Sequence, residues 1–191
     1  AALKATDGRI RNNKDIFQDP SYKRHDAYGH NYRMPEVAAA LGLAQTESLS
    51  YFLELRAQIA AEFVDVMSEC DFLIPQYVPP GLNNSFWTVA ARYEMEGVSW
   101  QEFRYKFTEL GGDGIYAAWS LLYHEKLMSS GVWKERCPPL YRDIYFPEYG
   151  LCPVAEQTQP KIMQFVNNYG SLDEARPQIE ALRKTIRYYF F

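Results

Sequence analysis

The sequence is poor in features that mark several classes of protein. It has three cysteines, Cys70, Cys137 and Cys152, an odd number without the spacing of metal ligands. We therefore expect reduced thiols and no disulfide framework. No apolar run approaches the length that spans a membrane, and the first residues do not form a signal peptide. These absences predict a cytoplasmic protein that does not insert into a membrane.

An excess of basic charge is also missing. The chain carries 20 Lys and Arg against 24 Asp and Glu, a formal net charge of -4, so nucleic acid is not expected as a partner. Its three histidines have no H-x-x-x-H or H-E-x-x-H spacing, and we predict no metal site. No G-x-S-x-G elbow or P-loop occurs, and "GGDG" at 111–114 is typical of a helix end and turn.

Aromatic residues, in contrast, are abundant, with 15 Tyr, 11 Phe and 4 Trp among 191 residues. They either fill an irregular core or line a pocket or an interface. The residues Tyr116, Trp119 and Tyr123 illustrate the choice, since they could line the mouth of a site. The frequency with which aromatic side chains simply pack favours the core for all three.

The first third of the chain predicts two helices. Residues 1–28 have no regular pattern, and Pro35 suits the first position of a helix that continues through "EVAAALGLAQ". A second helix is expected from about 46 to 69, because apolar residues recur there at helical spacing. This stripe consists of Leu49, Phe52, Ile59, Phe63, Val66 and Cys70. Arg56 falls on the stripe, where its charge needs a partner or a route to solvent.

The rest predicts a mixture of strands and helices. Apolar runs at 72–78 and 86–93 flank a turn region and indicate two strands. Ser99 with Glu102, and Ser171 with Glu174, have the spacing of capping boxes, which predicts helices over 99–111 and 171–189. Residues 115–127 fit a strand or a short helix lining a pocket, 131–153 an ordered loop, and 156–167 another helix. This order predicts an α+β (α/β) domain preceded by an incomplete element, so we expect the chain to be part of a larger protein.

One stretch, "GHNYRMPEVAAALGLAQ" at 29–45, combines polar residues with a helix start. Asn31 and Arg33 lie just before the helix N-terminus, where backbone N–H groups and the helix dipole favour an anion. Alternatively, Asn31 caps a turn and Arg33 pairs with a surface carboxylate. Spacing alone favours this second interpretation, because surface ion pairs are common.

The same stretch resembles a segment of the DegT/DnrJ/EryC1/StrS family, the pyridoxal-phosphate-dependent sugar aminotransferases with the aspartate-aminotransferase fold. The family pattern G-x-N-Y-R-M, then A-A-x-G-L-x-Q, then R-x-x-I-A is similar to residues 29–60 in register. His30 stands where the family often has tyrosine or phenylalanine. "LCPVAEQTQPKIMQF" at 151–165 also looks like the closing segment of the family.

The resemblance implies a specific organisation. Residues 1–45 would be the remnant of the large cofactor-binding domain, 46–70 the long connecting helix, and 71–191 the C-terminal small α/β domain. In a homodimer, Asn31 would bind the phosphate of pyridoxal 5'-phosphate held by the other subunit, with Arg33 in the same anchor or in an ion pair at the interface. The implied reaction transfers an amino group, with glutamate as the expected donor, to a nucleotide-linked keto-sugar.

The sequence also departs from the family pattern. The family's Schiff-base lysine lies upstream of the G-x-N-Y-R-M segment, followed by a glycine-rich stretch, and Lys4, Lys14 and Lys23 are not in that context. We therefore assign no catalytic residue and expect the chain alone to be inactive and not to retain the cofactor. Two alternatives stay open, a non-catalytic dimerisation or interaction module derived from this fold and a fragment of a sugar dehydratase on the same scaffold.

Overall fold

The computed structural model describes residues 34–136, 139, 142–147 and 149–190. The chain divides into two units, Ala1–Leu49 and Ser50–Phe191, and each is described by itself. The predicted irregular segment at 1–28 lies outside the described residues. Among the helices that the structure describes, none is both long and apolar enough to cross a membrane.

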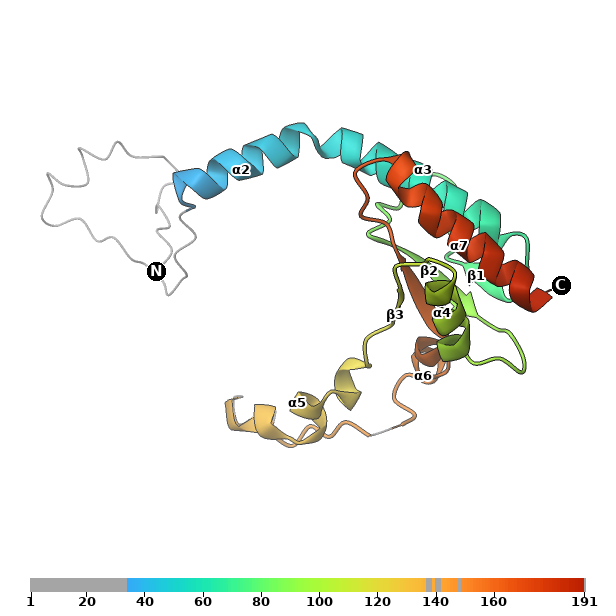
Figure 1. Ribbon diagram of the computed structural model, residues 1–191. Coiled ribbons are helices and arrows are strands. Elements are labelled where there is room, and N and C mark those ends of the chain that lie inside the picture. Colours follow the sequence, from blue (N-terminus) through green and yellow to red (C-terminus); the bar gives the residue numbers. More distant parts are fainter. Residues whose placement is uncertain (1–33, 137–138, 140–141, 148, 191) are drawn as a thin grey trace, which may run out of the picture. The chain divides into compact units, whose positions relative to one another are not determined.

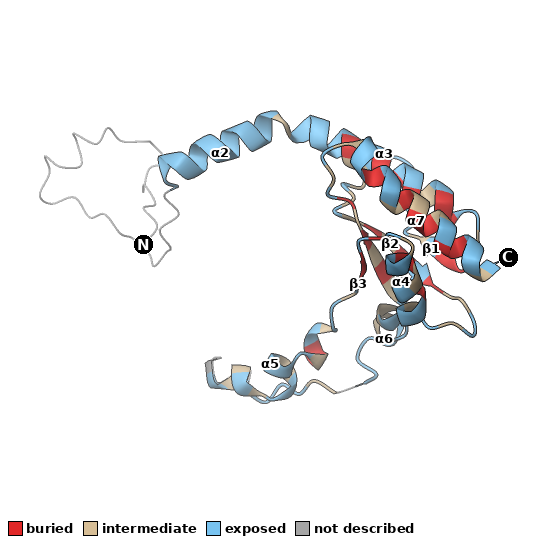
Figure 2. Ribbon diagram, in the orientation of Figure 1, coloured by how far each residue is buried: buried red, intermediate tan, exposed pale blue. Residues whose placement is uncertain are grey.

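The described part of the first unit is essentially one helix, α2 (Glu36–Glu47), as the sequence predicted. Pro35 is not its first residue but its N-cap, with φ -61° and an extended ψ of 148°. The prediction was therefore off by one position, because the ring of proline fixes φ and leaves ψ free to be extended. No residue of α2 is buried within this unit (Figure 2), so its apolar side chains Val37, Leu41 and Leu43 are exposed.

The next helix, α3 (Leu49–Met67), begins later and ends earlier than the predicted 46–69. Its apolar stripe is buried only over the C-terminal part of the helix. The buried residues there are Leu55, Ile59, Ala60, Phe63, Val66 and Met67. Leu49 and Phe52 were predicted on the same stripe, yet they are 51% and 38% exposed. The helical period was correct, but it does not show how far along the helix the packed partners extend.

The second unit is built on a four-stranded antiparallel sheet in the order β1-β2-β4-β3. β1 (Leu73–Pro75) and β2 (Thr88–Tyr93) lie inside the two predicted strands. For residues 115–127 the sequence left a strand or a short helix open. The first part of this segment is a strand, β3 (Ile115–Ala117), and a short 3-10 turn follows at Leu122–His124.

The strand β4 (Ile162–Val166) corrects the sequence analysis, which predicted a helix over 156–167. Helix α6 (Pro153–Thr158) is short, a 3-10 turn follows at Gln159–Lys161, and the chain then becomes extended. Met163 and Phe165 are buried while their neighbours are only half-buried, which is the period of two of a strand. β4 pairs with β2 on one side and β3 on the other, so it lies inside the sheet.

Helices cover one face of this sheet and form the core with it (Figure 1). The Phe165 ring of β4 contacts the ring of Phe63 from α3 at 5.7 Å and that of Phe107 from α4 (Trp100–Glu109) at 5.8 Å between centroids. α7 (Leu172–Phe190) adds Leu182, which is fully buried. A salt bridge of 2.8 Å joins Arg183 of α7 to Glu69, just beyond α3.

Both predicted capping residues start a helix, with a difference between the two. At α4 the box is complete, since Ser99 Oγ accepts from the Glu102 backbone and Glu102 Oε2 accepts from the Ser99 backbone over 2.8 Å. At α7, Ser171 Oγ accepts from Glu174 N, but the Glu174 carboxylate accepts from the backbone of Gly170. The sequence spacing thus predicted both helix starts correctly.

The described residues of the connection between β3 and β4 contain little regular structure, as predicted for 131–153. It includes a short helix α5 (Lys126–Ser129) and a 3-10 turn at Val132–Arg136. The "GGDG" segment is a helix end and turn as expected, with Gly111 at φ 100° and Gly114 at φ 123°.

Candidate functional site

The residues that the sequence assigned to the cofactor are not placed by the structure. Asn31 and Arg33 both lie outside the described residues, as does His30. Their expected role at a phosphate therefore stays a prediction. The site described below comes from the second unit alone.

The outer face of the sheet, opposite the helices, carries a cavity. It has a volume of about 830 Å³ and we call it the sheet-face hollow. It is lined by residues of α3 and of the strands β2, β3 and β4, together with residues directly before β2 and directly after β3 and β4. These are Arg56, Trp87, Thr88, Ala90, Tyr116, Ala117, Ala118, Trp119, Ile162, Gln164, Val166, Asn167 and Asn168. Alternation along β2 and β4 explains this set, because every second side chain points away from the core.

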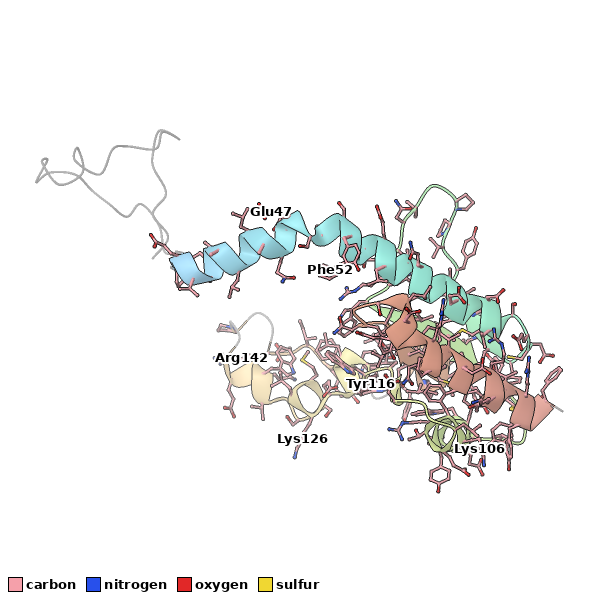
Figure 3. The ribbon with its side chains drawn as sticks, turned by 45° about the horizontal axis from the view of Figure 1, so that its top comes forward. Glu47, Phe52, Lys106, Tyr116, Lys126 and Arg142 are labelled. Carbon is pink, nitrogen blue, oxygen red and sulfur yellow. The ribbon has the colours of Figure 1, made fainter. Side chains whose placement is uncertain are left out.

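The sequence predicted that three aromatic side chains, Tyr116, Trp119 and Tyr123, belong to the core. Tyr123 is buried, as predicted. Tyr116, labelled in Figure 3, and Trp119 are instead 62% and 85% exposed and line the hollow. The core prediction is wrong for these two residues, since Tyr116 lies on the outward face of β3 and Trp119 lies beyond its end. Trp87, which the sequence analysis did not single out, is 68% exposed on the same hollow.

The centre of the hollow is held rigid by Gln164 of β4. Its Nε2 donates to the carbonyl of Ala117 over 3.1 Å, and its Oε1 accepts from the Thr88 hydroxyl over 3.2 Å. One side chain thus ties both neighbouring strands on the open face. Because these groups already bond each other, they form a floor and offer few free polar atoms to a ligand.

One end of the hollow is more polar. The Arg56 guanidinium donates to Asn168 Oδ1 over 3.3 Å, and the side chain is half-buried, so this charge has both a partner and access to solvent, the two alternatives that the sequence left open. The adjacent Asn167 is completely buried, and its Nδ2 donates to the carbonyls of Phe86 over 2.8 Å and Arg56 over 3.0 Å. Among the described residues, its Oδ1 is the one buried side-chain atom without a hydrogen-bond partner.

Phe86 has an unusual backbone at this end of the hollow. It has φ 45°, the left-handed region that few non-glycine residues adopt. Its N–H donates to Asn84 Oδ1 over 2.9 Å while its carbonyl accepts from Asn167. These two bonds fix the backbone immediately before Trp87. The sequence offered a signal for this turn in "GLNNSF", although nothing in it indicated a partner 81 positions away.

A second polar cluster surrounds Glu156 on α6. Its carboxylate accepts from the Tyr123 hydroxyl over 2.6 Å and from the backbone N–H groups of Gly150 and Cys152. The Tyr123 hydrogen bond is the main cause that lowers the pKa of Glu156. Burial and the bond to Glu156 raise the pKa of Tyr123 to about 12. Since the bonds satisfy the carboxylate, the cluster acts as a brace for the loop between β3 and β4.

The lysines among the described residues lie away from the sheet-face hollow. No lysine is among the described residues that line the sheet-face hollow. Of the described lysines, Lys106 pairs with Glu109 and Lys161 with Glu94 on the surface. Within the same described ranges, no group of three His, Cys, Asp or Glu side chains is arranged to hold a metal ion. Cys70 and Cys152 are free thiols.

Solved structures share this fold. The aminotransferase PseC of Helicobacter pylori, involved in the biosynthesis of pseudoaminic acid, is similar with a TM-score of 0.63 and 15% identity, over 90% of this chain and 42% of its own. A GDP-4-keto-6-deoxymannose-3-dehydratase, ColD, with bound GDP-perosamine has a TM-score of 0.59 and 18% identity, over 91% and 41% of the two chains. The Escherichia coli GDP-4-keto-6-deoxy-D-mannose-3-dehydratase with bound hydrated PLP has a TM-score of 0.60 and 19% identity, over 88% and 40%.

The chain thus spans about two fifths of the length of these structures. No curated protein matches its sequence at a significant level. A family model does match, over residues 5–138, which is more than half of the chain. The α+β fold agrees with that match. The chain belongs to the DegT/DnrJ/EryC1/StrS aminotransferase family.

Proposed function

We propose that this chain is the C-terminal portion of a pyridoxal-phosphate-dependent enzyme that transfers an amino group from glutamate to a nucleotide-linked keto-sugar. The observation that carries the proposal is the family match over residues 5–138, which includes the segment with Asn31 and Arg33. The similarity in fold to an aminotransferase of a sugar pathway supports it.

The proposed arrangement has three parts. Residues 1–45 are the end of the large cofactor-binding domain, 46–70 the connecting helix and 71–191 the small domain. The exposed apolar side chains of α2 support this assignment, since Val37 is 74% and Leu41 65% exposed within the described residues. A helix with such a surface normally packs against another element. We expect α2 to pack against the rest of the large domain and against a second copy of the chain in a cytoplasmic homodimer.

The cofactor is expected in the whole dimer and not in this chain alone. Asn31 would donate a hydrogen bond to the phosphate of pyridoxal phosphate in the other subunit, with Arg33 beside it. When bound, that group supplies the electron sink for chemistry at the amino-bearing carbon. The lysine that joins it is expected outside this chain, so the chain alone should have no aminotransferase activity.

A sugar dehydratase is the second candidate, favoured by a specific observation. Two of the structures that share this fold are dehydratases of a GDP-linked sugar. Their TM-scores of 0.59 and 0.60 are close to the 0.63 of the aminotransferase. The difference between the two reactions would lie in the residue at the lysine position, a histidine in the dehydratase, and that position is outside this chain.

The coding sequence upstream of Ala1, and the protein that it encodes together with this chain, provide the test. An in-frame lysine motif, with glutamate-dependent amination of a nucleotide-linked keto-sugar, supports the aminotransferase. A histidine at that position, with loss of water from the sugar, supports the dehydratase. Absence of an in-frame cofactor-binding half would contradict both and leave a non-catalytic interaction module.

The role of Asn31 can be measured in the same protein. Asn31→Ala should weaken pyridoxal phosphate binding by about tenfold or more, since a hydrogen bond to a charged group contributes about 1.5–3 kcal/mol. Asn13→Ala changes the same residue type outside the matched motif and should leave binding unchanged. Absorbance titration of the apo-enzyme with the cofactor gives both dissociation constants, and equal values would remove Asn31 from the site.

A further inference from the structure

We propose that the sheet-face hollow binds a phosphate ester that carries a planar ring, the chemistry of a nucleotide. The proposal deepens the proposed function and rests on it for the natural ligand, which would be the nucleotide-linked sugar. It assigns to the small domain a binding surface of its own. The argument uses only residues of the second unit.

The size and lining of the hollow fit a small ligand. Its volume of about 830 Å³ lies within the range of about 300–1,000 Å³ typical of ligand sites. Around Gln164 and Thr88 the floor is apolar, formed by small and branched side chains such as Ala90, Ile162 and Val166. A few polar groups lie at one end. An apolar surface with few, well-placed polar groups is the usual composition of such a site.

The ring-binding surface comes from the exposed aromatic side chains. Trp87 and Trp119 are 68% and 85% exposed, unusual for side chains of this size on a soluble surface, and Tyr116 is 62% exposed between them in the sheet. Thr88, next to Trp87, is in register with Val166, while Ala118 N donates to Ile162 O close to Trp119. Thr88 and Ala118 are therefore about 13 Å apart along β4 at about 3.3 Å per residue, and Trp87 and Trp119 follow them toward opposite ends of the strand.

Flat aromatic faces are suited to nucleobases. Stacking of a base on an aromatic side chain tolerates any base, because every base offers a π-face. The middle and far part of the hollow, with Tyr116 and Trp119, is where we place the ring. The hydrogen bonds of Gln164 fix the strands below it, so the surface is formed before a ligand arrives.

The phosphate position follows from charge. Among the described residues that line the hollow, Arg56 alone carries a charge, and no described carboxylate lines it. Its guanidinium has one side-chain partner among the described residues, Asn168 Oδ1 at 3.3 Å, so most of its donors are available. A guanidinium binds phosphate oxygens through paired, charge-assisted hydrogen bonds. The hollow is therefore selective for an anion at this end.

A buried amide lies at the same end of the site. Asn167 lines the hollow, is completely buried, and has an Oδ1 without a partner. Buried polar atoms without partners are rare in folded proteins, and they are often found where function requires them. Nδ2 of the same side chain donates to the carbonyls of Arg56 and Phe86, which holds together the backbones of α3 and of the residue before Trp87.

The test is a titration of the intact chain, followed by tryptophan fluorescence. The probes are UDP, uridine and inorganic phosphate, with UDP-glucose as the arm that distinguishes a free nucleotide from a nucleotide-linked sugar. UDP should quench saturably, and at least tenfold more tightly than uridine or phosphate. If UDP-glucose binds with the same affinity as UDP, only the nucleotide occupies the hollow. If UDP-glucose binds more tightly than UDP, the sugar contacts the hollow as well. Both results support the site.

Matched variants locate the binding. Arg56→Gln should weaken UDP about tenfold and leave uridine unchanged, whereas Arg92→Gln, on a cation outside the hollow, should change neither. Tyr116→Ala should weaken both UDP and uridine severalfold, whereas Tyr105→Ala, on a comparably exposed ring of α4 that does not line the hollow, should have no effect. Circular dichroism checks the fold of each variant. Should Arg56→Gln not fold, Arg56→Lys keeps the charge and should weaken UDP to a smaller degree.

Two results would overturn the inference. One is the absence of saturable quenching by UDP, and the other is binding that neither Arg56→Gln nor Tyr116→Ala alters. Equal affinity for phosphate and UDP would remove the ring from the proposal and overturn it as well. These failures are separate from the proposed function, because the whole protein could still aminate a sugar while its small domain binds no nucleotide.

Discussion

The side chain of Asn167 donates a hydrogen bond to the carbonyl oxygen of Phe86 over 2.8 Å, although 81 positions separate the two residues. Phe86 is the described non-glycine residue with a left-handed backbone. The second Nδ2 proton of Asn167 bonds the carbonyl of Arg56 in α3. One buried amide therefore joins a helix, a strained turn and the end of β4, three segments that are far apart in the sequence.

Replacement of Asn167 should be costly. Asn167→Ala removes two hydrogen bonds of a completely buried side chain, and we expect a loss of about 1–3 kcal/mol in the free energy of unfolding, from about 0.5–1.5 kcal/mol for each. Urea unfolding followed by circular dichroism measures the loss. Asn168→Ala, at the exposed neighbouring position, should lower stability by less than about 0.5 kcal/mol. Similar midpoints for the two variants would show that the buried amide does not hold the turn.

Gly112 is a position where only glycine fits. A Cβ there would overlap the buried ring of Phe107, while the backbone N–H of Gly112 bonds the Phe107 carbonyl over 2.8 Å. Gly112→Ala should therefore lower the free energy of unfolding by about 1–3 kcal/mol through overpacking. Gly42→Ala, in the open middle of α2 with no atom within 4 Å, is the control and should not destabilise. Thermal unfolding compares them, and equal melting temperatures would contradict the expected clash.

The capping box of α4 gives a third prediction. Ser99→Ala removes the oxygen that accepts from Glu102 N and should cost about 1 kcal/mol. Ser120→Ala removes an exposed hydroxyl outside any helix start and should cost little. Denaturant midpoints with unchanged slopes would report the difference. Were Ser120→Ala to cost as much as Ser99→Ala, the cap would not be the cause.

Tyr123 should make stability depend on alkaline pH. Burial first, and then the hydrogen bond to Glu156, raise its pKa from 10.0 to about 12 in the folded chain. Because the folded pKa is the higher one, this stabilisation is complete below pH 10 and is lost as pH rises through about 12. The melting temperature of the unmodified chain should fall over this range by more than that of Tyr123→Phe. A constant gap between the two curves would rule out a contribution from this phenol.

Glu156 predicts the opposite dependence in acid. The Tyr123 hydroxyl and two backbone N–H groups lower its pKa below the ordinary 4.5. The stabilisation is present above about pH 4.5 and is lost as pH falls through the lowered value. Glu156→Gln should lower the melting temperature at pH 7, and its difference from the unmodified chain should shrink toward pH 3. Glu96→Gln, on an exposed carboxylate, serves as the control and should show no such change.

The sequence predicted the local features and missed those that depend on distant partners. The capping spacing of Ser99 and Glu102 lies within four residues, so no tertiary contact is needed to recognise it. β4 was taken for part of a helix, although Met163 and Phe165 alternate, because five residues of alternation are ambiguous until the neighbouring strands are known. Exposure of Trp119 was equally hidden, since it depends on where β3 ends.

The candidate site was predictable in part. Arg56 was recognised from the stripe as a charge that needs a partner or a route to solvent, but Asn168 could not be found by spacing, because 112 positions separate them. The predicted phosphate anchor at Asn31 and Arg33 rests on a motif and lies outside the described residues. The hollow itself follows from the strand order, which pairs β4 with two strands that precede it by tens of residues, and a pattern along one chain does not contain that order.

The inner position of β4 also has a consequence for synthesis of the chain. Thr88 of β2 bonds Gln164 of β4 across 76 positions, so β2 has an unpaired edge until the ribosome has made almost the whole chain. Until then, β1 and β2 form a two-stranded ribbon, which is marginally stable at best in water. Contacts this distant slow folding, and an open strand edge invites pairing with other chains. A ribosome stalled before residue 162 would therefore expose a nascent chain that chaperones must protect.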